Sequence, residues 1–280
     1  MARMDLTSVS HYVNVQYMAQ IRNEADQLQA LDVAEGFHLV FLVALHAAAD
    51  PATWALKGGG NLRLYFDSLR FSEDIDIDVF VDPTRMRGRV EKAFASATLA
   101  KLLASLGSTR EYLNPKDRTD TKERWTIGLR NPAVPAMVYT QVELSYREYD
   151  LREYVVVEAP KSPAATGHPP VPSPTIGHYV PRGAVIQKIG ALRGRRHTQP
   201  RDVFDLDHLF RKFPSSPARG LVGNSDLDQA LARLFELEFA DYRAKVVSFL
   251  EPSIRAACDS ESYWAEMQLR VAGGLEAMRT

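Results

Sequence analysis

A proline-rich segment between residues 160 and 181 constrains the fold of this chain more than any other feature of its sequence. It holds seven of the chain's 16 prolines, with Ser, Gly and Thr between them. Because proline has no backbone N–H to donate, such a segment is expected to form a linker or a long surface loop. Strand patterns are concentrated before it and helix patterns after it. We therefore predict an α+β protein with an N-terminal domain at 1–158, a Pro-rich linker or loop at 159–181 and a mainly helical domain at 182–280.

Hydrophobic periodicity predicts the elements on either side of this segment. Apolar residues at helical spacing predict two helices within residues 15–49, separated at Gly36, and further helices at 61–69 and 87–106. Period-two alternation and short apolar runs predict strands at 53–56, 74–81, 125–129, 138–146 and 154–157. After the segment, helices are expected at 183–195, 200–212, 227–247 and 262–278.

The charge and cysteine counts exclude several classes of protein. Lys and Arg number 34 and Asp and Glu 35, so the net charge is −1 and any site for a polyanion must be a local patch. Cys258 is the only cysteine, which excludes a disulfide within the chain and cysteine-based zinc sites and fits a cytoplasmic protein. The apolar run at 37–49 is shorter than the roughly 20 residues that span a bilayer. We therefore expect a buried core helix there and no membrane partner.

Three aspartates alternate with apolar residues in the sequence Asp74-Ile75-Asp76-Ile77-Asp78-Val79. In a strand the three carboxylates would share one face at intervals of about 7 Å, with no Lys or Arg between them. Their mutual repulsion would be relieved by a hard divalent cation such as Mg²⁺ or Mn²⁺. The alternative is an exposed strand face whose carboxylates are solvated.

Two neighbouring features could complete a site for a phosphorylated ligand. Gly58, Gly59 and Gly60 follow a short strand and precede a helix, so their backbone N–H groups could bind a phosphate, although glycine triplets also form plain flexible turns. In the predicted strand 138–146, Glu143 could supply a further carboxylate for a pair of metal ions if this strand pairs with the first one. The alternative for Glu143 is an exposed side chain on a sheet.

A basic patch follows the proline-rich segment. Six basic residues stand against one acid, and they are Arg182, Lys188, Arg193, Arg195, Arg196 and Arg201. Such a patch suits a triphosphate or an RNA backbone, or it forms a solvated helix face. Asp202 and Asp205, three residues apart on the next helix, could hold the basic residues in place or merely complement the helix dipole.

Together these motifs resemble the AbiEii/AbiGii toxin family of nucleotidyltransferases, which includes the MenT-like toxins. The resemblance runs from about residue 56 to residue 207 and depends on motifs in a fixed order. These are Lys57-Gly58-Gly59-Gly60-Asn61-Leu62-Arg63, then Arg70-Phe71-Ser72-Glu73-Asp74-Ile75-Asp76, then Lys188 with Arg201-Asp202-Val203-Phe204-Asp205-Leu206. The chain departs from the family at Gly60, where members usually have Thr or Ser.

The resemblance implies a polymerase-β-type nucleotidyltransferase fold with a mixed sheet and a Mg²⁺- or Mn²⁺-dependent reaction with a nucleoside triphosphate. Carried over by position, Asp74 and Asp76 would be the metal ligands, Lys188 would contact the triphosphate and Asp202 would be the downstream acidic residue. Asp78 and Glu143 are the weaker candidates for metal ligation. The expected nucleotide-binding residues are Gly58, Gly59, Gly60, Arg63, Ser72, Lys188, Arg193 and Arg195.

The resemblance also implies partners. The family consists of the toxin halves of bacterial toxin–antitoxin pairs, so an antitoxin protein is expected, and MenT-like members add nucleotides to tRNA 3′ ends and so block translation. The leading hypothesis is therefore transfer of a nucleoside monophosphate to RNA, with tRNA as the acceptor. The alternatives are transfer to a protein hydroxyl and a catalytically silent protein that binds nucleotide or antitoxin.

Overall fold

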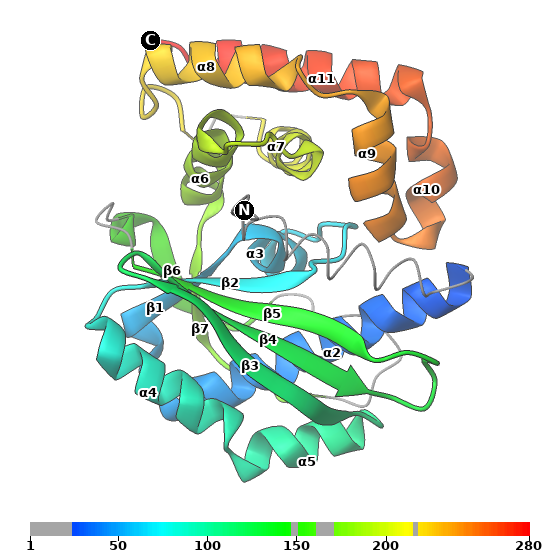
Figure 1. Ribbon diagram of the computed structural model, residues 1–280. Helices are drawn as coiled ribbons and strands as arrows, with labels where there is room; N and C mark the ends of the chain where they lie inside the picture. Colours follow the sequence, from blue (N-terminus) through cyan, green and yellow to red (C-terminus); the bar gives the residue numbers. More distant parts are fainter. Residues whose placement is uncertain (1–23, 147–150, 161–170, 215–217) are drawn as a thin grey trace, which may run out of the picture. The chain divides into compact units, whose positions relative to one another are not determined.

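A computed structural model of the chain describes residues 24–146, 151–160, 171–214 and 218–280 (Figure 1). It divides into two compact units, each built from separate stretches of the chain. The first unit contains Met1–Thr53, Glu73–Arg147 and Pro163–Pro174, and the second contains Trp54–Ser72, Glu148–Ser162 and Thr175–Thr280. The division into domains at 1–158, 159–181 and 182–280 stays a prediction.

The first unit contains a mixed four-stranded arrangement. Its strands are β2 (Asp74–Val79), β3 (Thr109–Thr119), β4 (Lys122–Arg130) and β5 (Val138–Ser145), in the order β3-β4-β5-β2. The pairs β3–β4 and β4–β5 are antiparallel, whereas β5 runs parallel to β2. The sequence did not predict β3, because Pro115 interrupts its pattern and most of its side chains are exposed.

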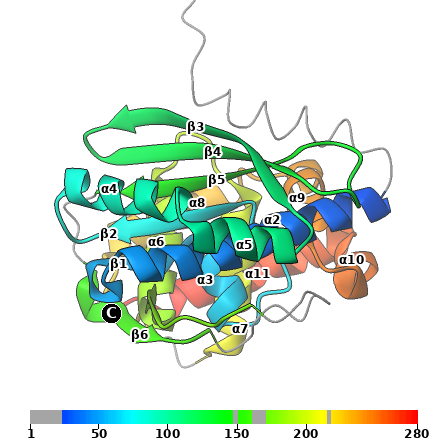
Figure 2. The same cartoon turned by 90° about the horizontal axis from the view of Figure 1, so that it is seen from below.

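Helices cover one face of these strands. They are α2 (Glu24–Ala48), α4 (Pro83–Phe94) and α5 (Ala97–Ser105), with the short 3₁₀ turn η1 (Pro51–Thr53) after α2 (Figures 1 and 2). The expectation of one helix over 87–106 was wrong, because Ser96 caps a new helix by accepting a hydrogen bond from the Leu99 N–H at 3.1 Å.

The helix α2 is the central helix of the first unit. It continues through the buried Gly36, so the expected break there was wrong. Burial of Phe37 and Phe41, which follow the glycine one helical turn apart, outweighs the roughly 1 kcal/mol that a helical glycine costs. The earlier part of the expected helices lies outside the described residues. By length and composition α2 could cross a membrane, but 78% of its most apolar stretch is buried in the described structure. The prediction of a buried core helix is therefore confirmed.

The second unit begins with three strands and a helix. Its strands are β1 (Trp54–Lys57), β6 (Val155–Glu158) and β7 (Ile176–Tyr179), with β7 parallel to β1 and antiparallel to β6. The helix α3 (Gly58–Tyr65) follows β1 directly, and the 3₁₀ turn η2 (Arg152–Tyr154) precedes β6.

The strand β7 lies within the segment that was expected to form only a linker or a long surface loop. None of its four residues is a proline, and all four are buried between β1 and β6. The prolines flank the strand, and Pro181 occupies the first turn of the next helix, where no N–H is needed.

Helices make up the rest of the second unit. They are α6 (Pro181–Gly194), α7 (Pro200–Lys212), α8 (Asn224–Leu234), α9 (Phe239–Lys245), α10 (Pro252–Cys258) and α11 (Glu261–Glu276), with η3 (Val247–Phe249) after α9. The predicted bounds of α7 are confirmed, whereas the expected helix at 227–247 is divided between α8 and α9 and α10 was not predicted. The α+β class with mixed strand pairing and a helical C-terminal part is confirmed.

Candidate active site

Three aspartates lie on one face of β2 in the first unit, as the alternation predicts. Asp74, Asp76 and Asp78 are half-buried, whereas Ile75 and Ile77 on the opposite face are buried. The like charges are therefore gathered on one face of a strand whose other face anchors it in the core of the unit.

Glu143 joins this acidic face from the neighbouring strand. The parallel register between β2 and β5 places Glu143 beside Asp76, so the strand pairing on which the suggested role of Glu143 depended is present. The Glu143 carboxylate is already shared between two cations, with its Oε2 atom 2.7 Å from Lys122 Nζ and 2.7 Å from Arg124 Nη2. Burial alone would raise the pKa of Glu143, but the two cations outweigh burial and lower it. A metal ion at Glu143 would have to compete with both cations.

Sequence reasoning missed Lys122 and Arg124, since it began the strand at residue 125. The structure begins β4 at Lys122 and pairs Arg124 directly with Glu143. Arg124 also attracts Asp74 electrostatically. The alternation of the sequence could have extended this strand, because Lys122 and Arg124 stand two residues apart and so share one face, with the buried Glu123 between them on the other.

A buried hydrogen-bond chain within the first unit fixes the start of β2. The Thr140 hydroxyl donates to the Glu73 carbonyl at 2.8 Å, so it must accept from His38 Nε2, which lies 2.7 Å away. Burial lowers the pKa of His38 to about 3, so the ring is neutral at physiological pH and can supply that single N–H. The chain thereby holds the backbone next to Asp74.

The glycine triplet lies in the second unit, at the start of α3. Gly58 has a φ of +65°, a backbone conformation that favours glycine. At Gly59, an added Cβ would lie 2.8 Å from Ser72 Oγ and 3.0 Å from Arg70 Nη2. The structure therefore brings Ser72 and Arg70 against the glycine backbone, and both side chains are buried. At Gly60 a Cβ would only meet Leu56 at an ordinary 3.4 Å.

These distances predict opposite effects for alanine at neighbouring glycines. Gly59→Ala should destabilise the protein by about 1–3 kcal/mol, because Ser72 or the backbone must shift. Gly60→Ala should stabilise it by about 0.4–1 kcal/mol through the loss of unfolded-state freedom. Urea denaturation of the two variants measures both values. Equal effects at the two positions would contradict this account of the glycine turn.

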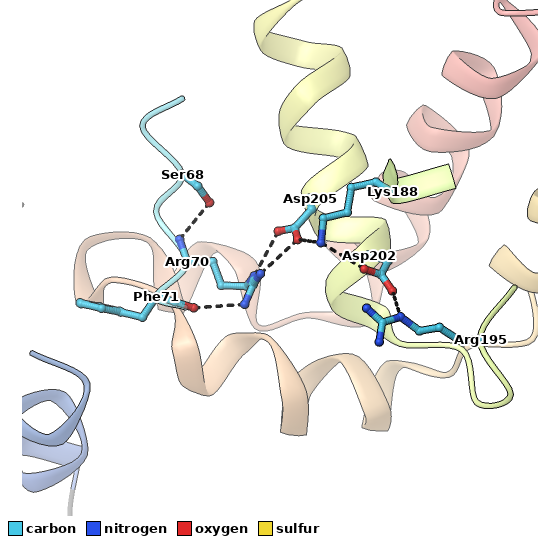
Figure 3. A network of polar contacts seen from close by, with 7 residues as sticks. All are labelled: Ser68, Arg70, Phe71, Lys188, Arg195, Asp202 and Asp205. Atoms are coloured by element: carbon cyan, nitrogen blue, oxygen red, sulfur yellow. Dashed lines mark hydrogen bonds and ion pairs between the residues drawn. The ribbon is translucent and has the colours of Figure 1, made fainter. Parts of the chain in front are cut away.

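The most extensive polar network of the candidate site joins five charged side chains of the second unit (Figure 3). Lys188 Nζ lies 3.1 Å from Asp202 Oδ1 and 2.6 Å from Asp205 Oδ2. Arg70 donates from Nε and Nη2 to the two oxygens of Asp205, each at 3.1 Å, and Arg195 Nε lies 2.8 Å from Asp202 Oδ2. Of the two roles that the sequence left open for Asp202 and Asp205, these contacts show the first, because both carboxylates hold basic residues.

Burial makes this network electrostatically strong. Asp202 and Asp205 are fully buried, and the side chain of Lys188 is 9% exposed. Burial alone would raise the pKa of Asp205, but Arg70 and Lys188 outweigh it and hold that pKa well below its usual range. The pKa of Asp202 is likewise lowered by Lys188 and Arg195 against the effect of burial. Three cations thus meet two carboxylates, and the network carries one surplus positive charge.

Arg70 was not among the predicted site residues, although it opens the motif that contains Ser72 and Asp74. Two predicted nucleotide-binding residues lie in other contacts: Arg63 pairs with Glu251 at 2.5 Å and lies over the Phe71 ring, and Arg193 pairs with Asp226 at 3.2 Å. Arg195, at 40% side-chain exposure, belongs to the network.

The oxygen donors of β2 fit a divalent metal ion. Among residues 24–146, 151–160, 171–214 and 218–280, no three His, Cys, Asp or Glu side chains form a metal-binding group by themselves. Mg²⁺ is commonly held by only one or two carboxylates, with water and substrate phosphates as the other ligands. Asp74 and Asp76 provide such a pair of hard donors on one strand face.

Solved structures identify the class of fold. The chain is similar to an H. pylori protein described as a candidate nucleotidyltransferase, with a TM-score of 0.57 and 21% identity over 89% of this chain and 94% of that chain. It is also similar to JHP933 from Helicobacter pylori, with a TM-score of 0.52 and 20% identity over 89% of this chain and 91% of that one. No curated protein sequence matches the chain. The class is thus that of the nucleotidyltransferase-like α+β folds.

The sequence itself gives the family. Residues 40–277 match the model described as "Nucleotidyl transferase AbiEii toxin, Type IV TA system". The chain belongs to this family of nucleotidyltransferase toxins. Membership implies a nucleoside triphosphate substrate, typically a divalent metal, and an antitoxin partner.

Proposed function

We propose that this protein transfers a nucleoside monophosphate from a nucleoside triphosphate to RNA, with the 3′ end of tRNA as the acceptor, and so blocks translation. The observation that carries the proposal is the acidic face of β2, on which Asp74 and Asp76 alternate with buried isoleucines. Family membership gives the reaction class, and this face gives the oxygen donors that the reaction needs.

In the proposed reaction, the acceptor hydroxyl attacks the α-phosphorus and loses its proton to solvent. The bond to the β-phosphate breaks, and pyrophosphate leaves. Asp74 and Asp76 would hold Mg²⁺ or Mn²⁺, which supplies Lewis-acid stabilisation of phosphate and hydroxyl oxygens. Asp78 and Glu143 are the weaker candidates for this role.

Lys188 would stabilise the negative charge of the triphosphate. Its ammonium has three N–H donors, and Asp202 and Asp205 together account for two of them. The two buried carboxylates hold the ammonium in place, so that its remaining donor is oriented before the substrate binds. Gly58, Gly59 and Gly60 would add backbone donors, and Ser72, which lies against Gly59, and Arg195, which pairs with Asp202, would be further nucleotide-binding groups.

The test combines purified protein, total tRNA, Mg²⁺ and each α-labelled nucleoside triphosphate in turn. We expect label on tRNA with one nucleotide preferred and none with the Asp76→Ala variant. Label that migrates with protein would instead favour transfer to a protein hydroxyl. Mg²⁺-dependent nucleotide binding without any transfer would favour a silent nucleotide- or antitoxin-binding protein.

A further inference from the structure

A cavity in the first unit lies apart from the residues assigned above. Its volume is about 290 Å³, and it lies between the C-terminal end of α2 with η1 and the helix α4. The side chains that matter here are His46 and Asp50 from the first wall and Arg85 and Arg89 from the second. No predicted metal- or nucleotide-binding residue lines this cavity.

The α4 wall carries two positive charges. Arg85 and Arg89 are one helical turn apart, so both side chains project from the same face of α4. Within the part of the chain that the structure describes, neither guanidinium has a carboxylate partner. Arg87, between them in sequence, points elsewhere and pairs with Glu123 at 2.6 Å. Two adjacent guanidiniums that no described carboxylate neutralises present N–H donors and positive charge suited to binding a phosphate.

The opposite wall offers mainly acceptors. Asp50 is exposed, and its Oδ1 accepts from the Ala52 N–H at 3.0 Å. The last carbonyls of α2 also lie at this end of the helix, where the dipole favours hydrogen-bond donors. His46 Nδ1 is buried and, among the described residues, has no hydrogen-bond partner. A bare phosphate would be repelled by Asp50, whereas a ribose hydroxyl could donate to it.

We propose that this cavity binds one ribose–phosphate unit of an RNA strand, which would be the acceptor of the proposed reaction; the inference therefore rests on that proposed function. Arg85 and Arg89 bind the phosphate, and Asp50 accepts a hydrogen bond from the 2′-hydroxyl, the group that distinguishes RNA from DNA. The volume accommodates a unit of about this size and leaves the rest of the strand outside.

The experiment measures binding of the full chain, without nucleotide, to a short fluorescein-labelled single-stranded RNA and to DNA of the same sequence. The test variant is Arg85→Ala/Arg89→Ala. The matched control is Lys92→Ala/Lys101→Ala, which removes two exposed charges from α4 and α5 outside the cavity. We expect the test variant to bind RNA about tenfold more weakly than the control and to show a salt slope shallower by about 0.7, for the one phosphate that both arginines bind.

A second variant tests the ribose contact. Asp50→Asn keeps an oxygen for the Ala52 N–H but loses the anionic acceptor, so the preference for RNA over DNA should fall while DNA binding is retained. An unchanged preference would overturn the ribose contact, and competition by free ATP at this cavity would identify a nucleotide as the occupant in place of RNA.

Failure of this inference is distinguishable from failure of the proposed function. If Arg85→Ala/Arg89→Ala binds RNA like the control while wild-type protein still labels tRNA, the cavity assignment is wrong and the proposed function stands. If wild-type protein neither binds nor labels RNA, the proposed function is wrong and this inference falls with it.

Discussion

Asp76→Ala is expected to lower nucleotide transfer by about 10³-fold or more while leaving the protein folded. Asp76 is half-buried on the acidic face of β2, and its neighbours in the strand, Ile75 and Ile77, make the core contacts. Removing the carboxylate takes away a proposed metal ligand but no apolar contact. It also removes one of several like charges from that face, so the free energy of unfolding should not fall.

The control for this prediction lies on the same strand. Asp78→Ala removes an identical side chain from the same face, two residues further along and outside the Asp-x-Asp pair. The initial rates of transfer of labelled nucleotide by the two variants should differ by at least about tenfold. Thermal unfolding checks that the two variants are equally stable. If Asp76→Ala and Asp78→Ala turned over at the same rate, the acidic face would act as a whole and no Asp-x-Asp ligand pair would exist.

The acidic face could be predicted from sequence because strand alternation is a local property. Asp74, Asp76 and Asp78 needed only the period of two, and the same reasoning placed Glu143 on a strand. The contacts of Glu143 with Lys122 and Arg124 could not be predicted, because they depend on which strands become neighbours and in what register.

The buried network of the second unit shows the same limit over longer separations. Spacing left two roles open for Asp202 and Asp205, holding basic residues or complementing the helix dipole, and the contacts with Lys188 and Arg195 show the first. The partner that sequence reasoning missed is Arg70, which stands 135 residues before Asp205 and pairs with it bidentately. Likewise β7 was hidden because its flanking prolines dominate the composition, although the four residues of the strand are all buried.

Asp205→Ala is expected to cause the largest loss of stability among single substitutions at the candidate site. It leaves Arg70 without its carboxylate and Lys188 with one partner instead of two, all in a buried environment. Breaking a buried ion pair in this way costs about 3–5 kcal/mol. Thermal unfolding should report a decrease in Tm of about 6–20 °C.

A matched control uses an exposed pair of the same unit. Asp226→Ala breaks the contact with Arg193, in which both side chains are more than a third exposed, and should cost less than about 1 kcal/mol. Equal losses of unfolding free energy for Asp205→Ala and Asp226→Ala would contradict the conclusion that burial makes the network strong.

The network also predicts how stability depends on pH. The folded-state pKa values of Asp202 and Asp205 are lowered, so their contribution is present above the unfolded pKa of about 4 and is lost as pH falls through the folded values. Acid should therefore destabilise wild-type protein increasingly below pH ~4. In Asp205→Asn one of the two depressed groups is gone, so this acid-dependent loss should be smaller.

Replacing the buried charges together separates the stability of the network from its role in transfer. The triple variant Arg70→Met/Lys188→Met/Asp205→Leu removes all three charges at once, so none of them is left buried without its partner. Asp202 retains its contact with Arg195. Such apolar replacements of buried ion groups are often neutral or stabilising, so the triple variant should regain most of the stability that Asp205→Ala loses. It should still fail to transfer nucleotide, because Lys188 is absent. Recovery of both stability and transfer would show that Lys188 does not contact the triphosphate.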